Sequence, residues 1–205
     1  MKLGVMGGTF DPIHIGHLVI AEEARHRFGL DHVVFIPSAR PPHKTDIKSS
    51  PPGDRLRMVQ LAIEGNENLS VSDMEIERKG LSYTVDTLHE LHRVHGADTE
   101  LFFITGADAL LEILTWKEPG KLLSRSRFIV ATRPCFSLEN VHEALPKLDN
   151  CGRPSVENVL KMEIPALDIS STGIRERAAD GRPFRYLVPE PVWSYIVQEE
   201  LYKKR

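Results

Sequence analysis

Cysteine is scarce in this sequence, with only Cys135 and Cys151 among 205 residues. Two cysteines cannot build the disulfide framework of a small secreted domain or a multi-cysteine metal site, so we expect a reducing, cytoplasmic setting. Long apolar runs are also missing, because no stretch approaches the ~20 residues of a membrane-spanning helix. The apolar run Leu3 to Met6 is interrupted by Gly4 and is too short for a signal peptide. These absences predict a cytoplasmic protein that does not contact a membrane.

A large excess of positive charge is absent as well. The chain has 26 Lys and Arg against 29 Asp and Glu, a formal net charge of −3. Nucleic-acid-binding domains usually show a strongly basic face, so we expect no nucleic-acid partner, although a local basic pocket stays open. The 41% hydrophobic and 27% charged shares are ordinary for a soluble globular protein. The length predicts one domain over residues 1–205, with a helical C-terminal part from about residue 170 to 205.

Short runs of β-branched and aromatic residues alternate with amphipathic helical patterns along the chain. The first such unit is strand, helix, strand within residues 3–36, which implies a parallel sheet with a right-handed crossover. We therefore predict an α/β fold, a Rossmann-like doubly wound parallel sheet with helices on both faces and a small C-terminal helical extension. The predicted strands cover residues 3–6, 33–36, 69–72, 101–104, 127–131 and 159–164; residues 137–158 give no clear pattern.

The sequence also lacks two familiar phosphate-binding motifs. The turn after the first predicted strand, Gly-Gly-Thr-Phe-Asp-Pro-Ile-His-Ile-Gly-His over residues 7–17, has neither the P-loop ending nor the three-glycine dinucleotide pattern. It nevertheless joins a strand end to a helix start, where phosphates bind in open α/β sheets. His14 and His17 would share one face of the first helical turn. We interpret the segment as a phosphate-contacting loop, the alternative being that both histidines are ordinary helix-start residues.

These residues carry a resemblance to a known family. The segment 7–17 resembles the nucleotide-binding signature of the nucleotidyltransferase superfamily, and Ile-Ser-Ser-Thr-Gly-Ile-Arg at 169–175 resembles its C-terminal phosphate-binding motif. Further stretches resemble bacterial nicotinate-nucleotide adenylyltransferases, namely residues 41–44, 82–88, 106–108 with 116–117, and 186–189. The resemblance extends from residue 3 to about 201. It implies transfer of AMP from ATP to nicotinate mononucleotide in NAD biosynthesis, giving deamido-NAD and pyrophosphate.

The resemblance also implies roles for individual residues. Catalytic roles fall to His14, His17, Lys44 and Arg175. ATP-binding roles fall to Gly7, Gly8, Thr9, Phe10, Gly106, Asp108, Arg133, Ser171 and Thr172. Recognition of the nicotinate nucleotide falls to Thr84, Trp116 and the backbone around Lys117.

Several of these roles have structural alternatives. Trp116 could belong to the core, Thr84 could cap a helix beginning near Val85, Lys44 could be a solvated charge, and Arg175 could form a surface ion pair. For Asp86 we prefer a stabilising role in the first turn of that helix.

The chemistry explains why no general base is evident. A phosphate monoester has a second pKa near ~6, so the nucleophile is already mostly ionised at pH 7. The site must instead align two polyanions and stabilise developing negative charge, with both histidines as donors. We expect Mg²⁺ to arrive with ATP, since the sequence offers no dedicated carboxylate cage and Asp11 is at best an outer-shell partner. Nicotinamide mononucleotide or another phosphorylated acceptor stays open as an alternative substrate. The sequence also leaves open whether the protein is a homo-oligomer and whether the loop 37–53 closes on the substrates.

Overall fold

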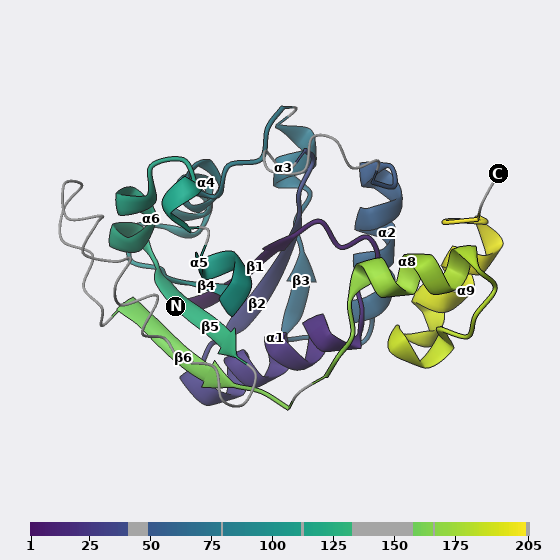
Figure 1. The fold of residues 1–205 in the computed structure, drawn as a ribbon. Coiled ribbons are helices and arrows are strands. Elements are labelled where there is room, and N and C mark those ends of the chain that lie inside the picture. Colours follow the sequence, from purple (N-terminus) through teal and green to yellow (C-terminus); the bar gives the residue numbers. More distant parts are fainter. Residues whose placement is uncertain (41–48, 79, 112, 133–157, 166, 204–205) are drawn as a thin grey trace.

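The computed structural model of the chain contains one parallel six-stranded sheet with the order β3-β2-β1-β4-β5-β6 (Figure 1). The structure describes residues 1–40, 49–78, 80–111, 113–132, 158–165 and 167–203. The strands are β1 (Lys2–Gly8), β2 (His32–Pro37), β3 (Leu69–Val71), β4 (Glu100–Gly106), β5 (Arg127–Thr132) and β6 (Val159–Glu163). The prediction of a parallel doubly wound sheet is confirmed, and each predicted strand is present within two residues of its expected bounds.

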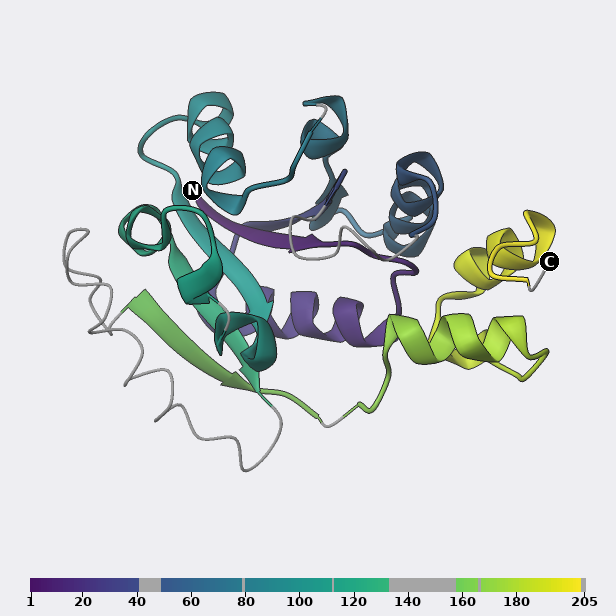
Figure 2. The same ribbon diagram turned by 45° about the horizontal axis from the view of Figure 1, so that its top comes forward.

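Helices cover both faces of the sheet (Figure 2). Alternate residues of each strand point to opposite faces, so one core contains Phe35 and Ile104 while the other contains Ile36 and Phe103. The first core is closed by α1 (Ile15–Phe28) and α2 (Pro52–Ile63), and the second by α4 (Thr84–His95), α5 (Ala107–Leu111) and α6 (Pro119–Arg125). Strands buried on both faces explain the continuous apolar runs in the sequence.

Two short elements were absent from the sequence prediction. The helix α3 (Met74–Glu77) follows β3, and the 3-10 turn η2 (Ile113–Thr115) follows α5. Each spans a single turn or less, which is too short for a hydrophobic period to be visible in the sequence. In the structure α5 ends at Leu111, and η2 begins at Ile113.

The C-terminal segment forms two helices that lie beside α2 (Figure 1). These are α8 (Ser171–Ala179) and α9 (Glu190–Gln198), with the 3-10 turn η5 (Arg185–Leu187) between them. Ile174, Val192 and Ile196 bury their side chains in the same core as α1 and α2. The Tyr195 hydroxyl donates to Asp54 Oδ1 of α2 over 2.8 Å. Apolar packing and this hydrogen bond hold the segment against α2.

The strand order creates a crevice between β1 and β4. The chain leaves β1 toward β2 on one side and returns through β4 toward β5 on the other, so the connections after these two neighbouring strands diverge. Ligands of open α/β sheets bind outside the carboxyl ends of the strands at such a switch point. Within the described residues, no helix is long and apolar enough to cross a membrane.

Candidate active site

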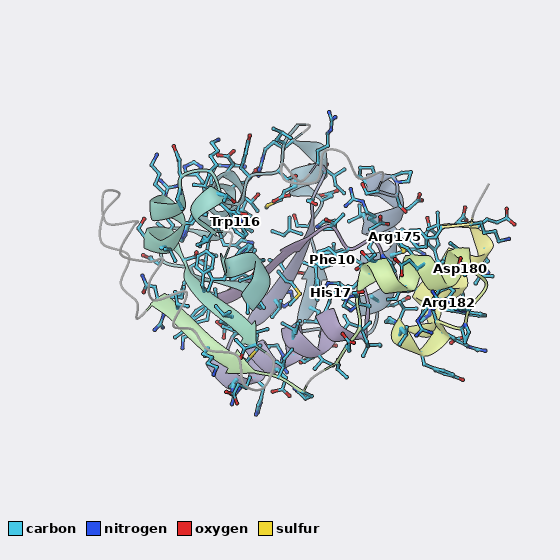
Figure 3. The ribbon with its side chains drawn as sticks, in the orientation of Figure 1. Phe10, His17, Trp116, Arg175, Asp180 and Arg182 are labelled. Carbon is cyan, nitrogen blue, oxygen red and sulfur yellow. The ribbon has the colours of Figure 1, made fainter. Side chains whose placement is uncertain are left out.

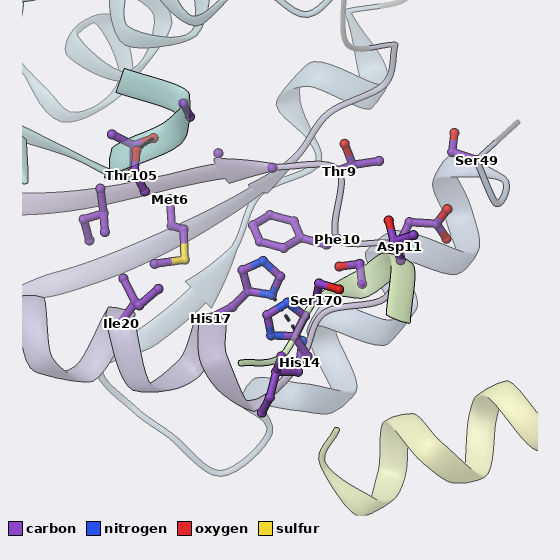
Figure 4. A pocket seen from close by; sticks show the side chains of 18 of the residues that line it. Met6, Thr9, Phe10, Asp11, His14, His17, Ile20, Ser49, Thr105 and Ser170 are labelled. Carbon is purple, nitrogen blue, oxygen red and sulfur yellow. Dashed lines mark hydrogen bonds between the residues drawn. The ribbon is translucent and has the colours of Figure 1, made fainter. Parts of the chain in front are cut away.

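A cavity with a volume of about 570 Å³ lies at this switch point (Figure 4). It is bounded by the carboxyl ends of β1 and β4 and by the N-termini of α1 and α8. Ten of the sequence-predicted site residues line it: Gly7, Gly8, Thr9, Phe10, His14, His17, Gly106, Ser171, Thr172 and Arg175. Two motifs about 160 residues apart therefore face one cavity.

The loop after β1 is shaped by Phe10. Its φ of 50° lies in the left-handed region, and its ring is buried against Phe35 at 5.7 Å and His17 at 5.2 Å between centroids. A Cβ added at Gly8 would lie 3.0 Å from the Phe10 ring, a distance that forces neighbouring atoms to move. The close packing of this loop thus favours glycine at position 8. Figure 4 shows Phe10 between the end of β1 and the two imidazoles.

His14 and His17 stack at the start of α1. Their ring centroids are 3.7 Å apart with an interplanar angle of 24°, and His14 is the N-cap residue. The His14 backbone N–H donates to Nδ1 of His17 over 3.2 Å. With Nδ1 accepting, we assign the proton of neutral His17 to Nε2, which leaves that nitrogen as a donor. The stacking and this hydrogen bond therefore fix the His17 ring at the cavity, with its Nε2–H as a donor.

Both imidazoles are neutral at pH 7 in the free protein. Burial lowers the pKa of His14 to about 4. Burial, reinforced by the charge of the neighbouring His14, lowers the pKa of His17 to about 3. The buried Nδ1 of His14 has no hydrogen-bond partner among the described residues. Burial makes it costly to protonate these two imidazoles in the free protein. A bound anion would offset that cost, so the pair is suited to binding an anion.

These shifts predict how stability depends on pH. The unfolded histidines protonate near pH 6.5 while the folded ones stay neutral until about pH 4 and about pH 3. The unfolded state therefore binds more protons in this window, and the free energy of unfolding should fall as the pH is lowered from about 6.5 to 4. Urea denaturation at several pH values should show this decline in the wild type and a shallower one in His14→Asn. Equal slopes in the two proteins would contradict the assigned pKa values.

The helix α8 brings Arg175 and two hydroxyl groups to the cavity. Ser170 is its N-cap, and the Ser170 side chain accepts from the Gly173 N–H over 3.1 Å. Ser171 Oγ donates to the Pro12 carbonyl over 2.9 Å, and Arg175 Nη1 donates to the Asp11 carbonyl over 2.7 Å. These bonds tie α8 to the loop after β1, so the two helix N-termini point at one space.

Arg55 of α2 is a site-shaping residue that the sequence analysis missed. Its side chain is fully buried and donates to three backbone carbonyls: Thr9 at 2.8 Å, Ser50 at 3.0 Å and Ala39 at 3.3 Å. One guanidinium thereby joins the loop after β1, through Thr9, to both ends of the connection between β2 and α2, through Ala39 and Ser50. A signal existed, because Arg55 lies three and four residues before the buried Met58 and Val59 and so interrupts the apolar face of α2.

Replacing Arg55 with alanine should lower the free energy of unfolding by about 3 kcal/mol or more, since three part-buried carbonyls would lose their shared donor and a fully buried side chain would be removed. Arg57→Ala is the matched control, because Arg57 lies in the same helix with an exposed side chain. Urea denaturation should show a large loss for Arg55→Ala and a change within about 0.5 kcal/mol for Arg57→Ala. Similar losses in both variants would mean that helix propensity, and not the buried guanidinium, sets the effect.

A second cavity of about 320 Å³ adjoins the first. It shares His14, Ile20, Gly106 and Ile169 with the first cavity and extends toward the ends of β5 and β6. Its remaining walls are mostly apolar: Gly16, Ala107, Ala131, Thr132, Ile164 and Leu167. The site thus has a polar compartment under two helix N-termini and an apolar compartment beside it.

The residues predicted to bind the nicotinate nucleotide lie apart from both cavities. Thr84 is the first residue of α4 after the N-cap Tyr83, so the alternative that Thr84 caps the helix is wrong. The Trp116 ring packs edge-on against Phe103 at 5.9 Å, which agrees with the core alternative (Figure 3). Lys117 Nζ is 3.0 Å from an Asp86 carboxylate oxygen and 4.6 Å from the Tyr83 ring centroid. The start of α4 and residues 116–117 are therefore neighbours.

Three further predictions cannot be placed. Lys44 and Arg133 lie outside the described residues, and the side chain of Asp108 does too, although its backbone is the second residue of α5. Arg175 donates to the neutral oxygens of Asp11 and Thr172, which disfavours the alternative of a surface ion pair.

Comparison with known proteins agrees with this geometry. The family model described as cytidylyltransferase-like matches residues 5–177, so the chain belongs to this family of nucleotidyltransferases. Within it, the chain is 50% identical to the probable nicotinate-nucleotide adenylyltransferase of Desulfitobacterium hafniense strain Y51, over 98% of this chain and 96% of that protein. It is also 50% identical to the protein of the same name from Moorella thermoacetica, over 100% and 93% of the two chains.

Solved structures share the fold. The nicotinic acid mononucleotide adenylyltransferase of Plasmodium falciparum, complexed with NaAD, superposes with a TM-score of 0.77 at 20% identity. The superposition covers 98% of this chain and 97% of that one. At this identity the likeness establishes the Rossmann-like fold, while the relatives at 50% identity establish the family.

Proposed function

We propose that this protein transfers the adenylyl group of ATP to nicotinate mononucleotide, releasing pyrophosphate and forming deamido-NAD for NAD biosynthesis. The observation that carries the proposal is the convergence of the 7–17 and 169–175 motifs on one cavity at the switch point. Relatives at 50% identity over nearly the whole chain carry the name of this activity.

The polar compartment suits the triphosphate. Two helix N-termini direct positive partial charge and N–H groups toward it, and Arg175 adds a full positive charge. Gly106 lines both cavities, and a Cβ there would meet no atom of the described residues within 4 Å. Close approach of a ligand is therefore the physical reason for a glycine at this position. The apolar compartment suits the adenine ring, with Asp108 and Arg133 assigned to the adenosine by family resemblance.

The reaction forms one P–O bond and breaks another. A phosphate oxygen of the mononucleotide attacks the α-phosphorus of ATP, and the bond to the bridging oxygen of pyrophosphate breaks. Because the nucleophile is already ionised near pH 7, no proton has to be removed from it. The protein's part is to align the two phosphates and to stabilise charge on the leaving group.

His14 and His17 act as donors in this scheme. A pKa of about 3 makes His17 a poor base at pH 7 and suits a neutral Nε2–H that donates to a phosphate oxygen. A bound polyanion favours the protonated form of both rings, so their pKa values should rise on ATP binding. Lys44 and Arg175 are assigned to the phosphates because their side chains are positively charged.

The acceptor would lie between this cavity and the start of α4. Its nicotinate carboxylate is negative, whereas nicotinamide is neutral, and N–H groups in the first turn of α4 near Thr84 would favour the acid. The Lys117 ammonium is engaged by Asp86, so recognition at this position falls to its backbone. A site whose donors are left unpaired by the amide discriminates strongly against it.

A divalent metal ion accompanies triphosphate chemistry in an ATP-using family, and we propose Mg²⁺. Among the described residues, no group of three or more His, Cys, Asp or Glu side chains could hold a metal. Both Asp11 carboxylate oxygens accept protein hydrogen bonds. The residues present fit a metal held chiefly by the ATP phosphates and water, where it would neutralise phosphate charge.

The test is pyrophosphate release by the purified protein. ATP and CTP would each be combined with nicotinate mononucleotide, nicotinamide mononucleotide and phosphopantetheine. We expect the highest kcat/KM with ATP and nicotinate mononucleotide. Absence of pyrophosphate with that pair, or a higher rate with another acceptor, would refute the proposed substrate.

A further inference from the structure

The chain after α9 turns back toward the phosphate loop. Glu200 and Tyr202 have φ values of 52° and 68°, the left-handed region that non-glycine residues seldom adopt. The turn is held by the Leu201 N–H, which donates to the Ile196 carbonyl over 3.0 Å. Two such residues within three positions cost conformational energy, which persists only when the surrounding contacts require it. The contact made here is that of Tyr202 with Asp11, 191 residues earlier.

Asp11 is the point at which three parts of the site meet. Its side chain is 4% exposed, and its Oδ1 accepts from the Tyr202 hydroxyl over 2.7 Å. Its Oδ2 accepts from the Ser50 N–H over 3.2 Å, and its backbone carbonyl accepts from Arg175 Nη1. Ser50 leads into α2, and Arg175 belongs to α8. Both carboxylate oxygens of Asp11 therefore accept hydrogen bonds, and its backbone carbonyl is bound by Arg175 of the 169–175 motif.

A carboxylate in the lining of this cavity poses an electrostatic problem. Asp11 is the one acidic residue among the described residues that line it. Like charges within a few ångströms repel strongly where water is excluded, so a carboxylate turned toward a triphosphate would weaken its binding. Figure 4 shows the Asp11 carboxylate directed away from the two imidazoles. Tyr202 and Ser50 supply the bonds that keep it in that orientation.

The Tyr202 hydroxyl is suited to this task. Burial and the adjacent Asp11 raise the pKa of its phenol well above the ordinary value, so it stays protonated and can donate. Hydrogen bonds to charged groups are among the stronger ones in proteins. The 3.9 Å contact of the hydroxyl with Met58 Sδ places it at the edge of the apolar core, where the bond is shielded from water.

We propose that Tyr202 is a positioning residue of the nucleotide site, which holds the Asp11 carboxylate away from the bound triphosphate. The inference rests on the proposed function only in taking ATP as the polyanion. Tyr202 does not line the cavity; it acts through Asp11. Its removal should therefore penalise ligands according to their phosphate charge.

The test compares Tyr202→Phe with Tyr195→Phe. Both tyrosines follow α8, and each donates one hydroxyl bond to an aspartate of the main body, but Tyr195 binds Asp54 of α2, outside the cavity. Isothermal titration would give Kd for ATP and for AMP, with Mg²⁺ present. We expect Tyr202→Phe to weaken ATP binding about tenfold or more, the loss expected for a hydrogen bond to a charged group, and to change AMP binding far less. Tyr195→Phe should leave both Kd values near the wild-type values.

A double variant tests the cause. In Asp11→Asn, Tyr202→Phe no charge remains to face the triphosphate, so ATP should bind more tightly than to Tyr202→Phe alone. Removing both partners of a buried bond is also milder than removing one, so the double variant stays measurable if the single one is unstable.

Three results would overturn the proposal: equal effects of the two tyrosine variants, equal losses for ATP and AMP, or no gain in the double variant. Binding is measured without acceptor or turnover. Failure of the wild type to use nicotinate mononucleotide would refute the proposed reaction and leave this test readable.

Discussion

Replacing His17 with alanine should lower kcat for pyrophosphate release by about 10²- to 10³-fold, the loss typical of removing one donor to developing negative charge. The physical basis is the fixed tautomer of the ring. Nδ1 accepts the His14 N–H, so the neutral ring offers its proton at Nε2 without reorganisation. The effect should fall on kcat more than on the Kd of ATP, because charge grows on the leaving oxygen only in the transition state.

The matched control for this variant is His26→Ala. His26 lies in the last turn of the same helix, with its side chain exposed and outside both cavities. It should keep wild-type kcat. Circular dichroism melting would establish that both variants fold. Retention of more than about a tenth of wild-type kcat in folded His17→Ala would contradict a donor role of the expected size. A fall in wild-type activity below pH 7 that is absent from His17→Ala would instead indicate that His17 acts as a general base, contrary to its low pKa.

Arg175→Ala should lower kcat/KM for ATP by about 10²-fold or more, a loss in the range seen when a charged transition-state contact is removed. Arg175 contributes twice to the site. It brings a positive charge to the triphosphate compartment, and its Nη1 holds the Asp11 carbonyl over 2.7 Å, thereby joining α8 to the loop after β1. Loss of the side chain removes the charge and loosens the loop.

Arg175→Lys separates these two contributions, because lysine keeps the charge but lacks the planar fork that reaches Asp11 and Thr172 together. We expect it to recover part, not all, of the lost kcat/KM. Arg177→Ala is the control, since Arg177 also lies in α8 and donates to a backbone carbonyl, that of Pro183, outside the cavity lining. Equal losses in Arg175→Ala and Arg177→Ala would show that helix stability, not the site, is affected.

Much of this protein was predictable from local pattern. Segments such as 101–104 and 128–131 are buried on both faces, so each is a continuous apolar run that can be recognised without knowing its neighbours in the fold. The phosphate loop was recognisable for a similar reason: glycines, a threonine and two histidines occur together at one strand end. Local pattern was thus sufficient to predict the fold class and the phosphate-contacting loop, while the family resemblance supplied the individual roles of the ten predicted residues that line the cavity.

Contacts between distant segments were decided by the tertiary structure. Nothing near Tyr202 indicates that its hydroxyl reaches Asp11, and nothing near Arg175 indicates that it binds the carbonyl of the same residue, 164 positions earlier. The residues proposed to bind the nicotinate nucleotide show the same limit. The family resemblance suggested them, but only the structure shows that the Lys117 ammonium binds Asp86. Short elements such as α3 carry too few residues for a period to appear.

The sequence by itself therefore determined the parallel sheet and the phosphate-contacting loop, because hydrophobic period and residue type act over a few neighbouring positions. Its resemblance to a known family added the second phosphate motif and the class of chemistry. Only the tertiary structure decided how the site is held together. Arg55 joins the loop after β1 to the connection between β2 and α2, Tyr202 holds Asp11, and α8 is tied to the loop after β1. The physical reason is that a hydrogen bond depends on distance in space, which the folded chain sets between residues that the sequence keeps far apart.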